Sequence, residues 1–245
     1  MIKFFRKIRQ NLLAEKKTGK YFKYAIGEII LVVIGILIAL GINNWNIKNV
    51  EQKEVSTYLT SLKSNLIQDT LSLNSITKDI KQNIQSFDSI SSLIITQESK
   101  LILDSQSTRA LFNTHRFITE KNSFEDLTSN GKFGLIENKE IKEEILSYYN
   151  FIENNSLPFN NSLETYTRET FAPYFMRNYE LEYPIDFNLN LEEIPNFVSK
   201  NKNVLFELNA IKYRYFILNQ LIEVYAIITT NAKKTIDLIN SELKK

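Results

Sequence analysis

The chain of 245 residues contains no cysteine, and His115 is its only histidine. It therefore forms no disulfide, has no thiol nucleophile and carries no lipidated N-terminal cysteine. A zinc or transition-metal site would need carboxylates almost alone, and no clustered spacing suggests one. A lone histidine on a helix is more typical of a packed or surface residue than of a ligand.

The common catalytic motifs are also missing. The sequence contains no phosphate-binding glycine loop, nucleophile elbow or Asp-rich calcium loop. Glu140, Glu143 and Glu144 line the flank of an expected helix and indicate a solvated face. We therefore expect no enzyme activity, no catalytic residue, no cofactor and no metal.

Glycine and proline are scarce, with six and four residues. Residues 42–130 contain neither, so nothing in them forces a helix to stop. The first proline is Pro158.

The longest apolar run extends from Tyr24 to Ile42, and only Glu28 interrupts it. About 20 apolar residues at about 1.5 Å per residue cross the hydrocarbon core of a bilayer. We expect one membrane-spanning helix over residues 24–45, with Trp45 as an anchor at the membrane interface.

The charge of the flanks sets the expected orientation. Residues 1–23 carry eight Lys or Arg and only Glu15 as an acid, whereas the rest carries 22 basic and 27 acidic residues. Basic flanks stay cytoplasmic. We expect residues 1–23 to be a cytoplasmic arm on anionic lipid, and residues 46–245 to be periplasmic. Because basicity is confined to the arm, nucleic-acid binding is disfavoured.

A cleaved signal peptide is the alternative, with Ala39-Leu40-Gly41 as a small-x-small cleavage site. The long basic region, the length of the apolar run and the Trp45 flank argue for the anchor instead.

Residues inside the apolar run have two possible roles. Glu28 is an ionisable group in a spanning segment, which is a functional candidate; alternatively, it is a headgroup-level residue near the positive helix N-terminus. Gly35 and Ala39, with Gly27 two turns earlier, form a small-residue face that allows helices to approach closely. A homo-oligomer is therefore possible.

Two heptad seams alternate steps of four and three residues and predict long packed helices. The first consists of Val55, Leu59, Leu62, Leu66, Asp69, Leu73, Ile76, Ile80, Asn83, Phe87, Ile90 and Ile94. The second consists of Val204, Leu208, Ile211, Tyr215, Leu218, Ile222, Tyr225, Thr229, Ala232, Ile236, Ile239 and Leu243. Because no Gly or Pro separates Ile42 from the first seam, the anchor and the first long helix are expected to be continuous, unless they break at Asn43-Asn44.

The middle of the chain predicts shorter helices. One is expected over 105–120, and a second opens at a Ser123–Asp126 capping box and ends at Ser129. A third is expected from Asn138 to 154. A fourth is expected from Pro158 to Tyr179, with a kink or break near Thr170 caused by Pro173. A turn is expected at Asn130-Gly131, and a loop over 180–200. The fold class is thus all-α: a transmembrane helix followed by an elongated antiparallel helical bundle.

Several segments resemble one family. They are the opening Met1-Ile-Lys-Phe-Phe-Arg-Lys-Ile-Arg, Tyr24-Ala-Ile-Gly-Glu-Ile, Ile34-Gly-Ile-Leu-Ile-Ala-Leu and Ile42-Asn-Asn-Trp-Asn, with weaker echoes at Leu127-x-Ser129-x-Gly131 and Leu135-Ile136-x-Asn138-Lys139. The sequence is similar, specifically over 1–47, to uncharacterised single-span membrane proteins common in flavobacteria and other Bacteroidetes. It departs from them at Gly41, where a polar residue is expected. The resemblance implies an inner-membrane anchor with a periplasmic helical domain, and no activity.

Three functional hypotheses follow. The first is a non-enzymatic, membrane-anchored interaction or sensor-like module, with the lipid bilayer and other membrane or periplasmic proteins as partners. The second is an accessory subunit of an ion-driven or transport complex that uses Glu28. The third is a structural spacer.

Overall fold

The computed structural model describes residues 18–96, 102–181, 197–200 and 203–244. Contacts divide the chain into two compact units, Met1–Ser56 and Thr57–Lys245, which are described separately. Residues 1–17 of the expected basic arm over 1–23 lie outside the described residues.

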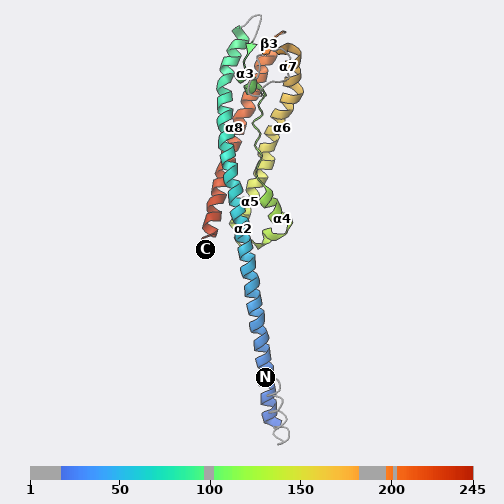
Figure 1. The fold of residues 1–245 in the computed structure, drawn as a ribbon, viewed down its shortest axis with the longest axis vertical. Coiled ribbons are helices and arrows are strands. Elements are labelled where there is room, and N and C mark those ends of the chain that lie inside the picture. Colours follow the sequence, from blue (N-terminus) through green and yellow to red (C-terminus); the bar gives the residue numbers. More distant parts are fainter. Residues whose placement is uncertain (1–17, 97–101, 182–196, 201–202, 245) are drawn as a thin grey trace, which may run out of the picture. The chain divides into compact units, whose positions relative to one another are not determined.

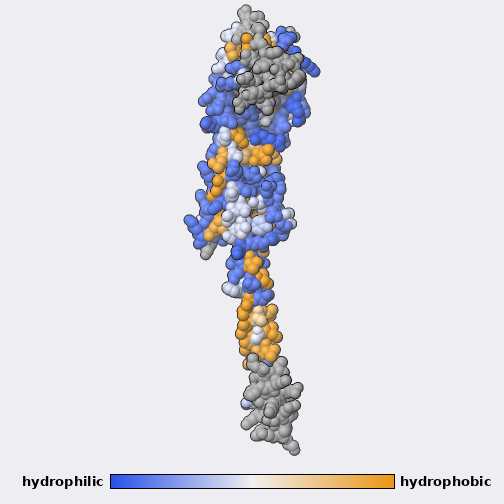
Figure 2. All heavy atoms as spheres, in the orientation of Figure 1, coloured by the Kyte–Doolittle hydropathy of each residue, from blue (hydrophilic) through white to orange (hydrophobic). Residues whose placement is uncertain are grey.

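Helix α2 runs without a break from Thr18 to Thr96, so the predicted continuity through Asn43 and Asn44 is confirmed. Large apolar side chains from Phe22 to Val50 on this helix are exposed, and Figure 2 shows the apolar surface on the side in view. It is the one described helix that is long and apolar enough to cross a membrane, a test that signal sequences also pass.

The second unit is a bundle in which α2 lies beside α8 (Val204–Glu242) (Figure 1). A further helical column consists of α5 (Lys139–Phe151), α6 (Leu157–Tyr166) and α7 (Ala172–Asn178). The two long helices are antiparallel: Lys63 Nζ donates to Asn240 Oδ1 at 3.2 Å near one end, and Ile94 and Ile211 line one small cavity near the other. The predicted all-α antiparallel bundle is confirmed.

The first predicted seam forms the buried face of α2. All nine buried residues of this helix lie on it, including the polar Asp69. Val55, Ile76 and Asn83 are half-buried. The four-three spacing therefore identified the correct helix face.

The second seam was half wrong. Its members Ile211, Leu218, Tyr225, Ala232 and Ile239 are buried, but those between them are half-buried or exposed. The buried positions that alternate with these five buried seam members along α8 are Glu207, Arg214, Leu221, Ile228 and Thr235. A search for apolar residues passes over this register because three of its positions are polar.

The connecting helices are α3 (Ser105–Phe112), α4 (Asn122–Ser129), the 3₁₀ turn η1 (Lys132–Leu135) and α5 (Lys139–Phe151). Asn138 caps α5 as predicted, because its Oδ1 accepts from Glu140 N–H and Ile141 N–H. The turn at Gly131 is confirmed by its left-handed φ of 69°.

Two predictions for these helices were wrong. The helix expected over 105–120 ends at Phe112. Helix α4 begins at Asn122, so Ser123 is no cap; its hydroxyl accepts from Asn65 Nδ2 instead.

Two π-helical turns lie just before Pro158 and Pro173. The first, η2 (Ile152–Ser156), joins α5 to α6 (Leu157–Tyr166). The second, η3 (Thr167–Phe171), joins α6 to α7 (Ala172–Asn178). Pro158 and Pro173 have no N–H for the carbonyls four residues earlier, so the local hydrogen bonds reach back five residues, from Leu157 to Ile152 and from Ala172 to Thr167. The predicted disturbance near Thr170 is present, but the helix does not break.

A small antiparallel sheet was not predicted. Its strands are β1 (Ile102–Leu103), β2 (Tyr179–Leu181) and β3 (Phe197–Ser199), in the order β1-β3-β2. Strands of two or three residues carry too few positions to show an alternating pattern. The remainder of the expected loop, with Pro184 and Pro195, lies outside the described residues.

Candidate functional site

The bundle contains a non-helical segment, residues 113–121, between α3 and α4. Its side chains alternate: His115 and Phe117 are buried, whereas Arg116, Ile118 and Glu120 are exposed. An extended chain against a helical core leaves its backbone N–H and C=O groups without helical partners, and these groups need others. The buried polar side chains of the bundle supply them.

Arg214 holds the start of the segment. Its guanidinium, which is fully buried, donates to the carbonyls of Ala110 at 3.2 Å and Asn113 at 2.6 Å, and to Thr167 Oγ1 at 3.0 Å. These carbonyls lie at the C-terminus of α3, where the helix dipole favours a cation. Burial lowers the Arg214 pKa from 12.5 to about 10, which leaves it charged at neutral pH.

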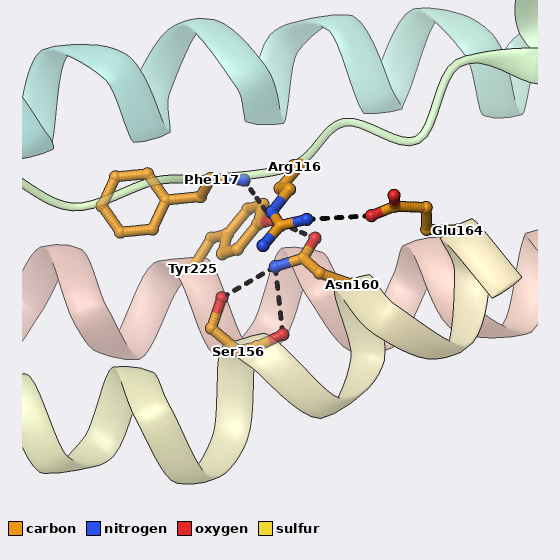
Figure 3. Close-up of polar contacts among 6 residues, drawn as sticks. All are labelled: Arg116, Phe117, Ser156, Asn160, Glu164 and Tyr225. Atoms are coloured by element: carbon orange, nitrogen blue, oxygen red, sulfur yellow. Dashed lines mark hydrogen bonds and ion pairs between the residues drawn. The ribbon is translucent and has the colours of Figure 1, made fainter.

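Tyr225 holds the middle of the segment (Figure 3). Its hydroxyl accepts from Phe117 N–H at 3.3 Å and lies 3.0 Å from both the His115 carbonyl and Asn160 Oδ1, which share its single proton. Asn160 Nδ2 in turn donates to Ser156 O and Ser156 Oγ. The π turn η2, which ends at Ser156, is thus linked to α8.

His115 adopts a left-handed backbone, with φ of 52°. Asn83 Nδ2 lies 2.6 Å from His115 Nε2, and because an amide NH₂ only donates, the ring nitrogen accepts. Burial, with a smaller effect of the charge of Arg214, lowers the pKa of His115 from 6.5 to about 4. The histidine is therefore a neutral packed residue, as its isolation in the sequence indicated.

Asp69 holds the end of the segment. Its carboxylate accepts from Glu120 N–H at 2.9 Å, from Thr119 Oγ1 at 2.5 Å and from Tyr148 OH at 2.6 Å. Desolvation by burial raises the pKa of Asp69, and these hydrogen bonds oppose that shift. Tyr149 OH completes the site by donating to the Glu120 carbonyl at 3.3 Å.

A second buried acid, Glu207, lies near the small sheet. Its Oε1 accepts from Tyr174 OH at 2.8 Å and Tyr179 OH at 3.0 Å, while its buried Oε2 has no hydrogen-bond partner among the described residues. Both tyrosine pKa values are raised, first by burial and then by the carboxylate. The adjoining cavity, about 10 Å³, has room for one water molecule.

A groove of about 270 Å³ opens along the outer side of the segment. Its lining comes from the segment, α4, α5, η2 and the start of α6: Arg116, Phe117, Ile118, Thr119, Lys121, Phe124, Glu125, Tyr149, Ile152, Glu153 and Leu157. The Phe124 and Tyr149 rings stack at a centroid distance of 4.2 Å. This groove lies beside the polar core, and the sequence does not reveal it, because its lining comes from residues up to 41 positions apart.

The residues that the sequence singled out lie apart from this core, in the first unit. Trp45 is 66% exposed, and Glu28 is half-buried along α2. A Cβ added at Gly27 or Gly35 meets no atom within 4 Å, and Ala39 is exposed, so the small-residue face is open in the single chain. Their functional roles stay predictions. Among the described residues, no group of three or more His, Cys, Asp or Glu could hold a metal ion.

The arrangement of these buried side chains positions a backbone segment. The signal of this core in the sequence is the pair of polar residues in the first seam, Asp69 and Asn83. Arg214 was missed because the apolar register excluded it.

Comparison with known proteins places the chain in one family. The sequence model of DUF6090, a family of unknown function, matches residues 28–166, more than half of the chain, so the chain belongs to this family. The expected resemblance to a family without assigned activity is thereby confirmed. The match runs from residue 28 to the end of α6, whereas the resemblance was expected to be specific over 1–47 and weaker beyond. No curated protein and no solved structure matches.

Proposed function

We propose that this DUF6090 member is a non-enzymatic interaction or sensor-like module, held in the inner membrane by one spanning helix. The family carries no assigned activity, so the proposal depends on this chain's own residues. Its resemblance to single-span proteins of Bacteroidetes supports the same setting.

The observation that carries the proposal is the exposure of the apolar part of α2. Its large apolar side chains, from Phe22 to Val50, are about half exposed or more, and none of the apolar window is buried. Soluble proteins rarely expose so large a continuous apolar surface. A lipid bilayer is the environment that covers it on every side.

The orientation follows from charge. The arm before α2's apolar part is strongly basic, which favours a cytoplasmic N-terminus and a periplasmic bundle. The absence of cysteine suits a bundle that depends on core packing and on the buried hydrogen bonds of the 113–121 segment.

The proposed role is tested by cross-linking mass spectrometry on intact cells, with carbonate extraction of membranes and intact mass of the extracted chain. We expect an uncleaved chain, retained in the membrane pellet, with cross-links from bundle lysines to periplasmic or membrane proteins. A mature chain that begins near residue 42 would favour the signal-peptide alternative. A retained anchor without cross-links to any other protein would favour the structural spacer.

A second candidate, an accessory subunit of an ion-driven or transport complex, is favoured only by Glu28 within the apolar run. It predicts that Glu28→Gln impairs assembly or growth. The interaction module predicts that both stay unchanged.

A further inference from the structure

We propose that the groove beside residues 116–118 binds an extended peptide of a partner protein, which adds to the segment as a strand. The inference rests on the proposed interaction role and names the chemistry of the partner. Its site is the groove of about 270 Å³ described above.

The first observation is an open backbone edge. In an extended chain, residues two positions apart present their N–H and C=O groups to the same side. On one side of the segment, the His115 carbonyl and the Phe117 N–H hydrogen-bond to Tyr225. On the other side, the Glu120 N–H and C=O hydrogen-bond to Asp69 and Tyr149. The backbone groups of Arg116 and Ile118 make no hydrogen bond within the described part of the chain.

The second observation is the shape of the groove. Both open residues line it, and Phe117, Ile152 and Leu157 contribute apolar surface. Its volume is below the range of about 300–1,000 Å³ typical of small-molecule pockets, but it suits one or two peptide side chains. Ile118, 75% exposed, offers an apolar contact at the rim.

Charge leaves an apolar peptide as the favoured occupant. The rim carries Arg116 and Lys121 against Glu125 and Glu153. Three of these four charges are compensated within the chain, since Arg116 pairs with Glu164 at 2.9 Å and Lys121 with Glu125 at 2.8 Å. The groove therefore selects by backbone hydrogen bonds and apolar fit, which is how strand addition works.

The segment is also fixed in place before any peptide binds. Arg214 and Tyr225 from α8 hold its start and middle, and Asp69 from α2 holds its end. A pre-organised edge loses little conformational entropy on binding, which favours affinity from few contacts.

The test uses the full chain in nanodiscs and a phage-displayed library of random peptides of about seven residues. Synthetic versions of the selected peptides are then titrated by fluorescence anisotropy. Ile118→Pro removes the backbone donor, Ile118→Ala keeps that donor, and Leu157→Trp fills the groove. We expect about tenfold weaker binding for Ile118→Pro, a change within about threefold for Ile118→Ala, and loss of binding for Leu157→Trp.

Thermal unfolding of each variant provides the folding control, and if Ile118→Pro does not fold, Leu157→Trp decides the outcome. Failure to select any peptide, or selected peptides whose affinity is unchanged by Leu157→Trp, overturns the inference. Because binding is measured in nanodiscs with both faces accessible, it does not depend on membrane orientation. If the bundle binds peptides but is found to face the cytoplasm, the peptide site stands and the proposed periplasmic location is wrong.

Discussion

Asp69 Oδ1 accepts the backbone N–H of Glu120 at 2.9 Å, across 51 residues of sequence. This bond explains why an acid occupies a heptad seam whose other buried members are apolar. At this level the seam faces the non-helical segment over residues 113–121. Polar seam residues therefore mark where the bundle encloses extended backbone.

The first prediction concerns Asp69. Replacement by leucine restores an apolar seam but leaves Glu120 N–H, Thr119 Oγ1 and Tyr148 OH without their acceptor. We expect Asp69→Leu to lower the free energy of unfolding by about 2–4 kcal/mol, measured by urea denaturation. Asp69→Asn keeps one acceptor oxygen and is expected to cost less. Equal or greater stability of Asp69→Leu would show that the segment does not need this acceptor.

The second prediction concerns Arg214. Arg214→Met removes the donors for the Ala110 and Asn113 carbonyls, and we expect a loss of about 3 kcal/mol in unfolding free energy. Arg214→Lys keeps the charge but cannot reach three acceptors in the fixed geometry of a guanidinium, so we expect an intermediate loss. A stabilised Arg214→Met protein, as found when apolar residues replace some buried ion pairs, would contradict the capping role.

The third prediction concerns pH. Because the pKa of His115 is lowered from 6.5 to about 4, the unfolded chain binds a proton within this window that the folded chain does not. Stability therefore falls as pH decreases from about 6.5 to about 4, by about 3 kcal/mol, and this contribution is constant below that window. Urea denaturation across this range measures the slope.

His115→Asn is the matched control, because asparagine tolerates the left-handed φ of 52° and does not titrate. Its slope between pH 6.5 and 4 is expected to be shallower. The raised pKa of Asp69 acts in the opposite direction, since the folded state then binds its proton more readily than the unfolded state. An unchanged slope in His115→Asn would mean that other groups produce the pH dependence.

The fourth prediction concerns the small-residue face of the apolar helix. Gly35→Leu adds a bulky side chain where the single chain has open space, so the stability of the isolated protein is expected to stay unchanged. If spanning helices associate through this face, chemical cross-linking in membranes yields less oligomer for Gly35→Leu than for wild type. The same oligomer content in both proteins removes this face as an interface.

The sequence predicted the bundle better than the site. The long helices followed from spacing alone, because nine of nine buried residues of α2 keep a four-three step. The second seam was placed half correctly, since Glu207, Arg214 and Thr235 are buried through partners elsewhere in the chain that spacing does not reveal. The helix predicted over 105–120 stops at Phe112, where Arg214 binds the terminal carbonyls.

The π turns show a similar limit. Pro158 and Pro173 signal a disturbance, and the sequence placed one of them near Thr170. Whether a helix breaks or shifts to a π turn depends on packing on both sides, here through Asn160 and Thr167, whose partners lie in α8. Local sequence does not contain that information.

We propose that one helix holds the bundle on the outer side of a membrane, and the accessibility of introduced cysteines tests this topology. Because the chain has no cysteine, Lys16→Cys and the exposed Ser64→Cys each introduce a single thiol. In Gram-negative cells with a permeabilised outer membrane, a membrane-impermeant maleimide is expected to label Ser64→Cys, and to label Lys16→Cys only after the inner membrane is lysed. Labelling of Lys16→Cys in intact spheroplasts, or protection of Ser64→Cys, would contradict the account.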